Sequence, residues 1–367
     1  MPRGLASVAS TPIRWGDMTN PTQSAAQPTT PLRDRVPAAT PVVPADTAEL
    51  RWRPATFDDL DRLMEIYTAI AAADHPNYGP DRDEEAEELR HSYVNLPLDS
   101  LVAEDVSTGS FAAVGLNIMP PVQETLVRSI LQGGVHPSYR GRGIGRALLQ
   151  WQTGRGLQQL ATSDKPLPGW LMVGTDKRAT ASTALYARAG FTPTRWFLGQ
   201  ERDVSTPIPE IAIDGPVRIV PYEPRYSEAT RVAKNASFRD HWGSQPTEVE
   251  QWNSMVGLPT FSAAHSYLAV TADDQVVGLL ITFVNEEDWA RQGFTGGYIG
   301  LVGVVREWRK RGIAPALLAR AMHSYADAGG HKASLDVDSD NPTGALGLYT
   351  GMGFTETTRE VSFTQVF

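Results

Sequence analysis

The chain has no cysteine among its 367 residues. Disulfides, thiolate metal sites and a cysteine nucleophile are therefore excluded, and a covalent acyl-enzyme would need another residue. The seven histidines are scattered, with no pair at the spacing of a helical or hairpin ligand set, so no metal is expected. No apolar stretch is long enough to cross a membrane, and Arg3 is not followed by the apolar segment of a secretory signal. We expect a cytoplasmic protein with no membrane partner.

A basic excess is also missing, because the formal net charge is −9 at pH 7. Proteins that bind nucleic acid usually carry clustered positive charge, so nucleic acid is not expected as a partner. A net negative charge still allows individual loops to be basic and to bind phosphate. The acidic surplus also agrees, weakly, with a cationic amine as substrate.

The first 46 residues have few large apolar side chains and are rich in proline, alanine, threonine and serine. Such a segment cannot bury enough surface to offset the entropy lost on ordering. Residues 1–46 are therefore predicted to be a disordered tail, in which Met18 offers an alternative start.

One short motif occurs twice, first from Val135 to Gly145 and again from Val304 to Ala314. Each copy joins a β-branched strand end, basic residues, a glycine turn and an amphipathic helix. Small residues let several backbone N–H groups point at phosphate oxygens, and the helix dipole adds partial positive charge. The motif predicts two pyrophosphate sites. The candidate cofactor-binding residues are Val135, Arg140, Gly141, Arg142, Gly143, Ile144 and Gly145 in the first copy, and Val304, Arg309, Lys310, Arg311, Gly312, Ile313 and Ala314 in the second. Val135 and Val304, at the strand ends, offer backbone N–H groups to the rest of the bound molecule rather than to the pyrophosphate.

Landmarks outside the loop repeat in the same order, between 163 and 169 residues apart. They are Leu50–Pro54 with Val217–Pro221, Asp74-His75 with Asp240-His241, Arg140 with Arg309, and Leu185–Phe191 with Leu348–Phe354. Repetition in order at nearly constant spacing indicates that a whole domain was duplicated. The predicted domains are residues 47–206 and 217–367, joined by a linker at 207–216.

Each half shows the same predicted succession of strands and helices. A short strand and a helix come first, two strands follow, and then come the strand entering the loop, a helix, a strand, a helix and a closing strand. Strands are predicted over 100–104, 111–118, 170–174, 267–271, 276–284 and 332–337, and helices over 145–160 and 314–328. The fold class expected is mixed α/β (α+β).

Other phosphate-binding folds also open on glycines after a strand. Neither copy has the full Gly-x-Gly-x-x-Gly spacing of a dinucleotide fold, and Gly-Lys-Ser/Thr, typical of triphosphate loops, does not occur. A lone glycine loop is more often a plain turn. A loop paired twice with a downstream Leu-Tyr-x-x-x-Gly-Phe favours acyl-CoA instead.

The strand, the Arg-x-x-Gly-x-Gly/Ala loop, the helix and the terminal tyrosine resemble the GNAT superfamily of acyl-CoA N-acyltransferases. The resemblance covers nearly all of residues 48–367, in tandem. It implies two GNAT domains, each a twisted, mostly antiparallel sheet of six or seven strands with helices on both faces, split where the pantetheine arm enters. It also implies acetyl-CoA as acyl donor and transfer of the acetyl group to an amine. The matching loop residues are Arg140, Gly143 and Gly145, then Arg309, Gly312 and Ala314.

The family resemblance assigns the proton for the departing thiolate to Tyr186 or Tyr349. Both could instead merely pack a helix against the sheet. Asn341 stands eight residues before Tyr349, where the family often has an asparagine that contacts the cofactor arm, but Arg178 occupies that place in the first half. Both halves are expected to bind acyl-CoA, with the C-terminal half as the catalyst.

The residues offer several candidates for the general base. Glu286 and His241 are candidates, together with Glu287, Asp288 and Asp240. His241 combines a titratable ring with nearby aromatic residues. The repeated Asp-His more readily caps a helix and fills a loop, the three acids more readily form a solvated loop, and ordered water could remove the proton without a dedicated base.

These observations predict an acetyl-CoA-dependent N-acetyltransferase in which a small-molecule primary amine attacks directly in a ternary complex. Two alternatives remain: an acyl-CoA-binding sensor or scaffold without turnover, and a protein acetyltransferase acting on lysines or N-termini. The partner expected is the small-molecule amine, and the chain is either a monomer or a homodimer.

Overall fold

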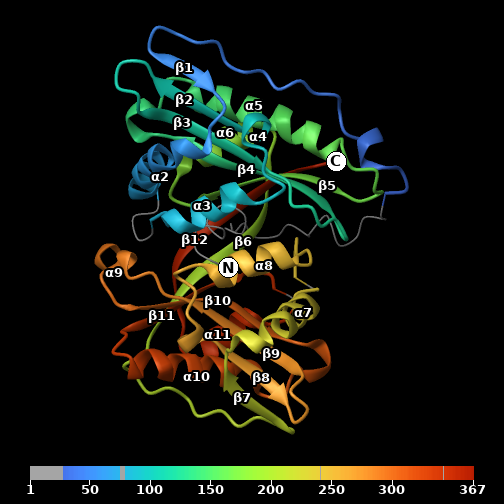
Figure 1. Ribbon diagram of the computed structural model, residues 1–367, viewed down its shortest axis with the longest axis vertical. Coiled ribbons are helices and arrows are strands. Elements are labelled where there is room, and N and C mark those ends of the chain that lie inside the picture. The colour runs from blue at the N-terminus through green and yellow to red at the C-terminus, as the bar shows by residue number, and fades with distance from the viewer. Residues whose placement is uncertain (1–27, 75–78, 240, 342) are drawn as a thin grey trace. The chain divides into compact units, whose positions relative to one another are not determined.

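The computed structural model describes residues 28–74, 79–239, 241–341 and 343–367. They form two compact units (Figure 1). The N-terminal unit contains the described residues up to Trp196 together with 360–367, and the C-terminal unit contains 197–359.

The N-terminal unit is built on five strands from its own half of the chain. Their order is β1-β2-β3-β4-β5, followed by β12, and every pair is antiparallel except β4 with β5. The predicted mostly antiparallel mixed sheet is confirmed. The strands are β1 (Leu50–Arg53), β2 (Ser100–Asp105), β3 (Phe111–Ile118), β4 (Val127–Val135) and β5 (Gly169–Asp176).

The C-terminal unit repeats this arrangement. Its order is β7-β8-β9-β10-β11, followed by β6, with β10 and β11 as the parallel pair. A single parallel pair at the same place in each sheet confirms the predicted duplication of the fold. The strands are β7 (Val217–Pro221), β8 (Tyr267–Thr271), β9 (Val276–Phe283), β10 (Gly296–Val304) and β11 (Lys332–Asp338).

The last strand of each sheet comes from elsewhere in the chain. Residues Glu360–Val366 of β12 (Thr355–Val366) pair with β5, and residues Phe197–Asp203 of β6 (Thr192–Asp203) pair with β11. Both strands have 12 residues, roughly 40 Å of extended chain. Residues 192–196 of β6 and 360–366 of β12 belong to the N-terminal unit, and residues 197–203 and 355–359 belong to the C-terminal unit. The units therefore divide within β6 and β12, whereas the sequence placed the division at 206 and 217.

Helices cover both faces of the N-terminal sheet (Figure 1). Leu63 and Ile66 of α2 pack with Leu89 of α3 on one face, and α5 packs on the other. The buried residues of α2, Leu60, Leu63 and Ile66, follow the three- to four-residue spacing of an amphipathic helix. The helices are α2 (Leu60–Asp74), α3 (Arg82–Arg90), α4 (Leu96–Asp99), α5 (Ile144–Leu160) and α6 (Thr180–Arg188).

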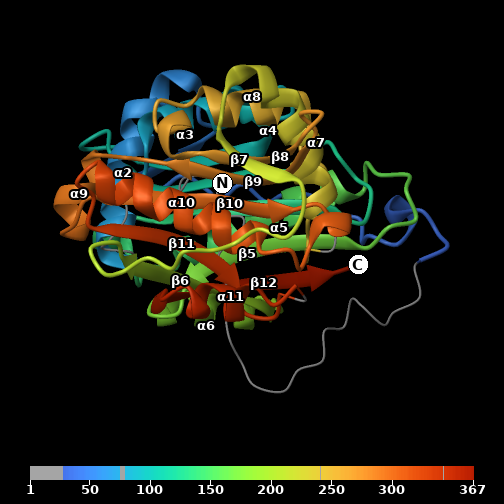
Figure 2. The same ribbon diagram turned by 90° about the horizontal axis from the view of Figure 1, so that it is seen from below.

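The C-terminal sheet is covered in the same way, with α7 and α8 on one face and α10 on the other (Figure 2). Trp252 of α8 and Tyr325 of α10 are the largest side chains buried on the two faces. The helices are α7 (Ser227–Ser237), α8 (Val249–Gly257), α9 (Glu287–Gln292), α10 (Ile313–Asp327) and α11 (Ala345–Gly351).

Residues 28–46 are packed against the N-terminal unit. Leu32, in the short 3-10 helix η1 (Leu32–Asp34), is fully buried, and its N–H donates to the Lys165 carbonyl at 2.9 Å. Val36 joins the same core cluster. The predicted disorder is therefore wrong for 28–46, because Leu32 and Val36 are buried in the core and further contacts, such as the hydrogen bond from Gln158 to the Ala39 carbonyl, hold the rest of the segment. The rest of the predicted tail, 1–27, lies outside the described residues.

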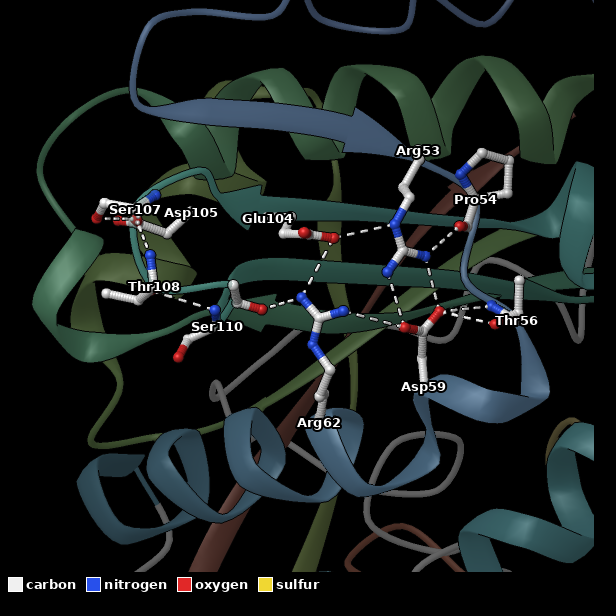
Figure 3. A network of polar contacts seen from close by, with 11 residues as sticks. Arg53, Pro54, Thr56, Asp59, Arg62, Glu104, Asp105, Ser107, Thr108 and Ser110 are labelled. Carbon is white, nitrogen blue, oxygen red and sulfur yellow. Dashed lines mark hydrogen bonds and ion pairs between the residues drawn. The ribbon is translucent and has the colours of Figure 1, made fainter.

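A network of ion pairs holds the start of α2 to the first two strands (Figure 3). Arg53 binds Asp59 through two hydrogen bonds of 2.7 Å and reaches Glu104 at 3.1 Å. Arg62 contacts both carboxylates and lies over the Phe111 ring. The guanidinium of Arg53 lowers the pKa of Asp59 to about 2. This network is a structural feature of the N-terminal unit.

Candidate active site

The parallel strands of the N-terminal unit separate partway along. β4 and β5 pair from Val127 with Gly169 as far as Ile130 with Met172. Beyond that point β4 stays with β3 to Val135, while β5 stays with β12 to Asp176. A gap therefore opens between the two strands, as the family resemblance implied.

The C-terminal unit opens earlier. β10 and β11 form three parallel pairs, ending at Tyr298 with Ser334. Gly300 then forms a bulge, since Ile299 pairs with Thr282 and Leu301 with Ile281. A bulged residue lies outside the ladder and shifts the alternation of the strand by one. Gly300 thus offers a backbone group beside the gap.

The two glycine loops follow the same backbone path. Gly143 precedes α5 with φ of 83°, and Gly312 precedes α10 with φ of 76°. A second left-handed residue comes two positions earlier, Gly141 at 79° in one loop and Lys310 at 63° in the other. The first N–H groups of a helix have no acceptor within it. Each loop therefore presents donors and a positive helix end to an anion.

The loop arginines bind protein groups. Arg140 Nε donates to the Val135 carbonyl at 3.1 Å, and Arg309 Nε donates to the Val304 carbonyl at 3.1 Å. Arg309 also donates to the Ser237 carbonyl at 2.9 Å. These contacts hold the loop against the end of the strand that borders the gap.

The structure explains one residue of the repeated Asp-His pair, Asp74. It ends α2, and its two carboxylate oxygens accept from Arg140 at 2.8 Å each. The aspartate therefore holds the loop arginine, a role that the sequence did not suggest. His75 and Asp240 lie outside the described residues.

Tyr186 and Tyr349 occupy corresponding places in the two units. Tyr186 packs against Phe191 and Phe363 at ring distances of 6.3 and 5.5 Å, and Tyr349 packs against Phe354 at 6.0 Å. Burial, and then the charge of Asp74, raise the pKa of Tyr186 to about 12. Burial likewise raises the pKa of Tyr349. Both phenols are therefore protonated at neutral pH and can serve as proton donors.

Asn341 and Arg178 make local contacts. Asn341 Oδ1 accepts from the Thr343 N–H at 2.8 Å, within the turn that leads to α11. Arg178 binds Asp176 through Nε at 2.9 Å and Nη2 at 2.7 Å. The asymmetry noted in the sequence is therefore present at the ends of the two corresponding strands.

The base candidates differ in their surroundings. Glu286 is exposed at the start of α9, and none of the contacts among described residues joins it to Tyr349. Asp288 is buried and accepts from Arg291 at 2.7 Å, which indicates a structural role. His241 stacks near Phe197 and Phe238, with ring centroids 6.2 and 5.7 Å away.

Sequence reasoning missed two polar pairs that involve the strands bordering the gaps. Gln132 of β4 donates to Glu88 of α3 at 3.1 Å, and burial raises the pKa of Glu88 to about 7. Tyr298 of β10 donates to Asp336 of β11 at 2.8 Å. The alternation of β11, with Ala333, Leu335 and Val337 buried on one face, was the signal that placed Asp336 on the other.

In the part of the chain that the structure describes, no group of three or more metal-ligating side chains gathers. None of its helices combines the length and apolar character needed to span a bilayer.

Comparison with protein families gives two matches. Residues 228–354 match the acetyltransferase (GNAT) family, and residues 100–193 match an acetyltransferase (GNAT) domain. One match falls in each half, as the duplication requires.

Two curated relatives of similar sequence are both named mycothiol acetyltransferase. Mycothiol acetyltransferase of Thermobispora bispora is 30% identical over 233 residues, covering 62% of this chain and 73% of the relative. The mycothiol acetyltransferase of Pseudarthrobacter chlorophenolicus is 27% identical over 323 residues, covering 84% and 94%. The similarity thus extends over both halves of a relative.

Among solved structures, a GCN5-related N-acetyltransferase from Sphaerobacter thermophilus has a TM-score of 0.64 at 23% identity. It covers 88% of this chain and 97% of its own. At this level of identity, the structural similarity supports the fold of this chain.

Proposed function

Because the chain belongs to the GNAT family of acetyltransferases, we propose that it transfers the acetyl group of acetyl-CoA to the primary amine of a small molecule. Members of this family are N-acyltransferases, and acetyl-CoA is the donor that the family implies. The observation behind the proposal is that β10 and β11 separate after Tyr298 and Ser334. The Gly312 loop follows β10, and the buried Tyr349 belongs to the core cluster that includes Leu335 and Val337 of β11.

The open backbone of the N-terminal glycine loop suits the pyrophosphate of CoA, whereas in the C-terminal loop the Ala212 carbonyl oxygen lies beside Gly312. Gly143 has open space where a Cβ would stand, and Gly141 does as well. A phosphate can therefore approach the backbone of α5 closely. In the C-terminal unit, Arg311 lies over Trp308 at 5.3 Å and keeps a cationic group beside the loop.

The chemistry is a direct acyl transfer. The amine nitrogen attacks the thioester carbon while the carbon–sulfur bond breaks, and the thiolate takes a proton. Tyr349 supplies that proton in the proposal, because its burial keeps the phenol protonated. A backbone N–H near Gly300 would stabilise the oxyanion.

The C-terminal unit is the proposed catalyst, with both units binding acyl-CoA. Its bulge, tyrosine and asparagine occur together, whereas the N-terminal unit has Arg178 bound to Asp176. In the proposal the N-terminal site binds the donor and supports the fold.

The proposed acceptor is a compact amine. Phe197, Phe238 and His241 line the side of the C-terminal sheet that faces away from α10, which suits a partly apolar molecule. The curated relatives are named for mycothiol, so their substrate is one amine to test.

The experiment follows CoA thiol release and acetylated product with acetyl-CoA and a panel of amines that includes the mycothiol acetyltransferase substrate, glucosamine and tyramine. Acetyl-CoA binding is measured calorimetrically in wild type, Arg140→Glu/Gly143→Glu and Arg309→Glu/Gly312→Glu, each checked for retained fold. Loss of one class of site in each double variant supports two working sites. Absence of binding in wild type overturns the proposal, and binding without any acetylated amine favours the sensor alternative.

A further inference from the structure

A tyrosine and a carboxylate meet where the C-terminal gap begins. Tyr298 belongs to the last parallel pair of β10 with β11, and Asp336 lies two residues beyond that pair on β11. The Tyr298 hydroxyl donates to Asp336 Oδ2 at 2.8 Å. The hydrogen bond therefore connects the two strands at the point where their ladder ends.

Asp336 lies on the side of the sheet opposite the proposed proton donor. Ala333, Leu335 and Val337 pack with Tyr349 and α10, so the alternate residues of β11 face the other way. Tyr298 packs there with Trp252 of α8. The amine and the thioester, reacting in the gap, would thus have Asp336 on one face of the sheet and Tyr349 on the other.

The carboxylate of Asp336 is exposed to solvent. Asp336 pairs with Gly199 of β6, and a Cβ at Gly199 would stand only 3.2 Å from Asp336 Oδ1. The Thr358 side chain fills the space beside Gly199, but Asp336 is itself exposed although Tyr298 is buried. A polar ligand can therefore reach the carboxylate.

Aromatic groups border the same face. Phe197 pairs with Asp338, and directly opposed residues of an antiparallel pair point to the same face. The His241 ring stacks on Phe197 at 6.2 Å. An amine bound at Asp336 would have its carbon skeleton near this aromatic wall.

The N-terminal unit lacks this pair at the matching ladder positions. Its last parallel pair is Ile130 with Met172, and Gly174 lies two residues beyond. Ile130 and Gly174 thus stand where the C-terminal unit has Tyr298 and Asp336. The tyrosine–carboxylate pair is therefore a feature of the C-terminal unit.

We propose that Asp336 binds the ammonium group of the acceptor and removes its proton, and that Tyr298 holds the carboxylate in place. This inference rests on the proposed function and names the base for it. The ammonium gives one proton to Asp336, which releases it to water at the exposed face. The neutral nitrogen then forms the carbon–nitrogen bond as the carbon–sulfur bond breaks. The second proton of the nitrogen leaves to solvent as Tyr349 protonates the thiolate and is itself reprotonated.

The test compares Asp336→Asn and Tyr298→Phe with Glu201→Gln in the full chain. Glu201 is a suitable control because it lies on the same face of β6, bound to Lys332 at 2.7 Å. The substrates are tyramine, glucosamine and 4-aminophenol, of which the last is mostly unprotonated at neutral pH. Acetyl-CoA affinity is measured in each variant by calorimetry.

Asp336→Asn should lower kcat/KM for tyramine and glucosamine by about 100-fold or more, the usual range for a lost general base. The loss with 4-aminophenol should be much smaller, because that amine has no proton to give up before attack. Tyr298→Phe should give an intermediate loss, and acetyl-CoA affinity should be unchanged in all variants. Asp336→Glu should recover part of the activity.

An equal loss for all three amines, or a matching loss of acetyl-CoA affinity, overturns the inference in favour of a structural role. Full activity of Asp336→Asn also overturns it while leaving the proposed function intact. If wild type acetylates none of the amines, the binding of tyramine to the CoA-bound protein is measured in wild type and in Asp336→Asn. Binding that depends on Asp336 supports the ammonium site and overturns the proposed function, and absence of binding overturns both.

Discussion

Asp74, at the end of α2, accepts two hydrogen bonds of 2.8 Å from the guanidinium of Arg140 in the glycine loop. The same guanidinium donates to the carbonyl of Val135, the last residue of β4. One side chain thus joins a helix end, a strand end and the loop. The repeated Asp-His of the sequence is explained at Asp74 by this support of the loop.

Asp74→Asn should weaken acetyl-CoA binding at the N-terminal loop by about tenfold, or about 1.4 kcal/mol, because Arg140 loses its charged partner. Binding at the C-terminal loop should not change. Calorimetric titration resolves the two sites. Asp61→Asn is the control, since Asp61 pairs with Arg82 at an exposed position. Equal affinities in wild type and Asp74→Asn would contradict the role of this contact.

The two loop glycines should respond differently to alanine. Both have positive φ, which costs an alanine about 1–2 kcal/mol. At Gly312 the new Cβ would also stand 2.5 Å from the Ala212 carbonyl oxygen, whereas Gly143 has nothing within 4 Å. Gly312→Ala should therefore lower the free energy of unfolding more than Gly143→Ala does. Denaturant unfolding measures both, with Gly257→Ala as a control at an open position, and equal losses would contradict the contact with Ala212.

Tyr349→Phe should lower kcat by about 100-fold without changing acetyl-CoA affinity, because phenylalanine keeps the packing against Phe354 and loses the proton. Tyr186→Phe should leave kcat within about threefold of wild type, since general acid catalysis is expected in the C-terminal unit. Steady-state thiol release measures both. A loss for Tyr349→Phe no larger than for Tyr186→Phe counts against the C-terminal unit as catalyst.

Arg53→Met should destabilise the N-terminal unit by about 2 kcal/mol, because it leaves Asp59 buried without its main cation. In wild type the pKa of Asp59 is lowered to about 2, against 3.8 in the unfolded chain. The stabilisation is therefore present above about pH 4 and is lost as the pH falls toward 2. Arg53→Met should remove this part of the acid dependence. Urea unfolding at several pH values measures it, and Arg82→Met, at an exposed pair, should have little effect.

Much of the fold could be predicted from local pattern. The predicted strand at 111–118 is β3, and the helix predicted from 145 begins at Ile144. A glycine with positive φ ahead of a helix is a local feature, so the sequence placed both loops well. The role of each loop residue in cofactor binding stays a prediction.

The missed features depend on residues far apart in the chain. Tyr298 and Asp336 are joined only because β10 and β11 run in parallel before they separate. Gln132 and Glu88 meet because α3 packs over β4. A polar residue in a strand gives no sign of its partner until the register is known.

The sequence by itself determined the duplication, the order of strands and helices, and the place of the two glycine loops, because these depend on spacing, hydrophobic period and glycine conformation. Tertiary structure alone decided that β12 completes the sheet of β5 and that β6 completes the sheet of β11. It also decided that Leu32 is buried and that Asp336 lies beside Tyr298. Strand pairing and burial between distant segments depend on the packing of the whole chain, and no local pattern encodes them.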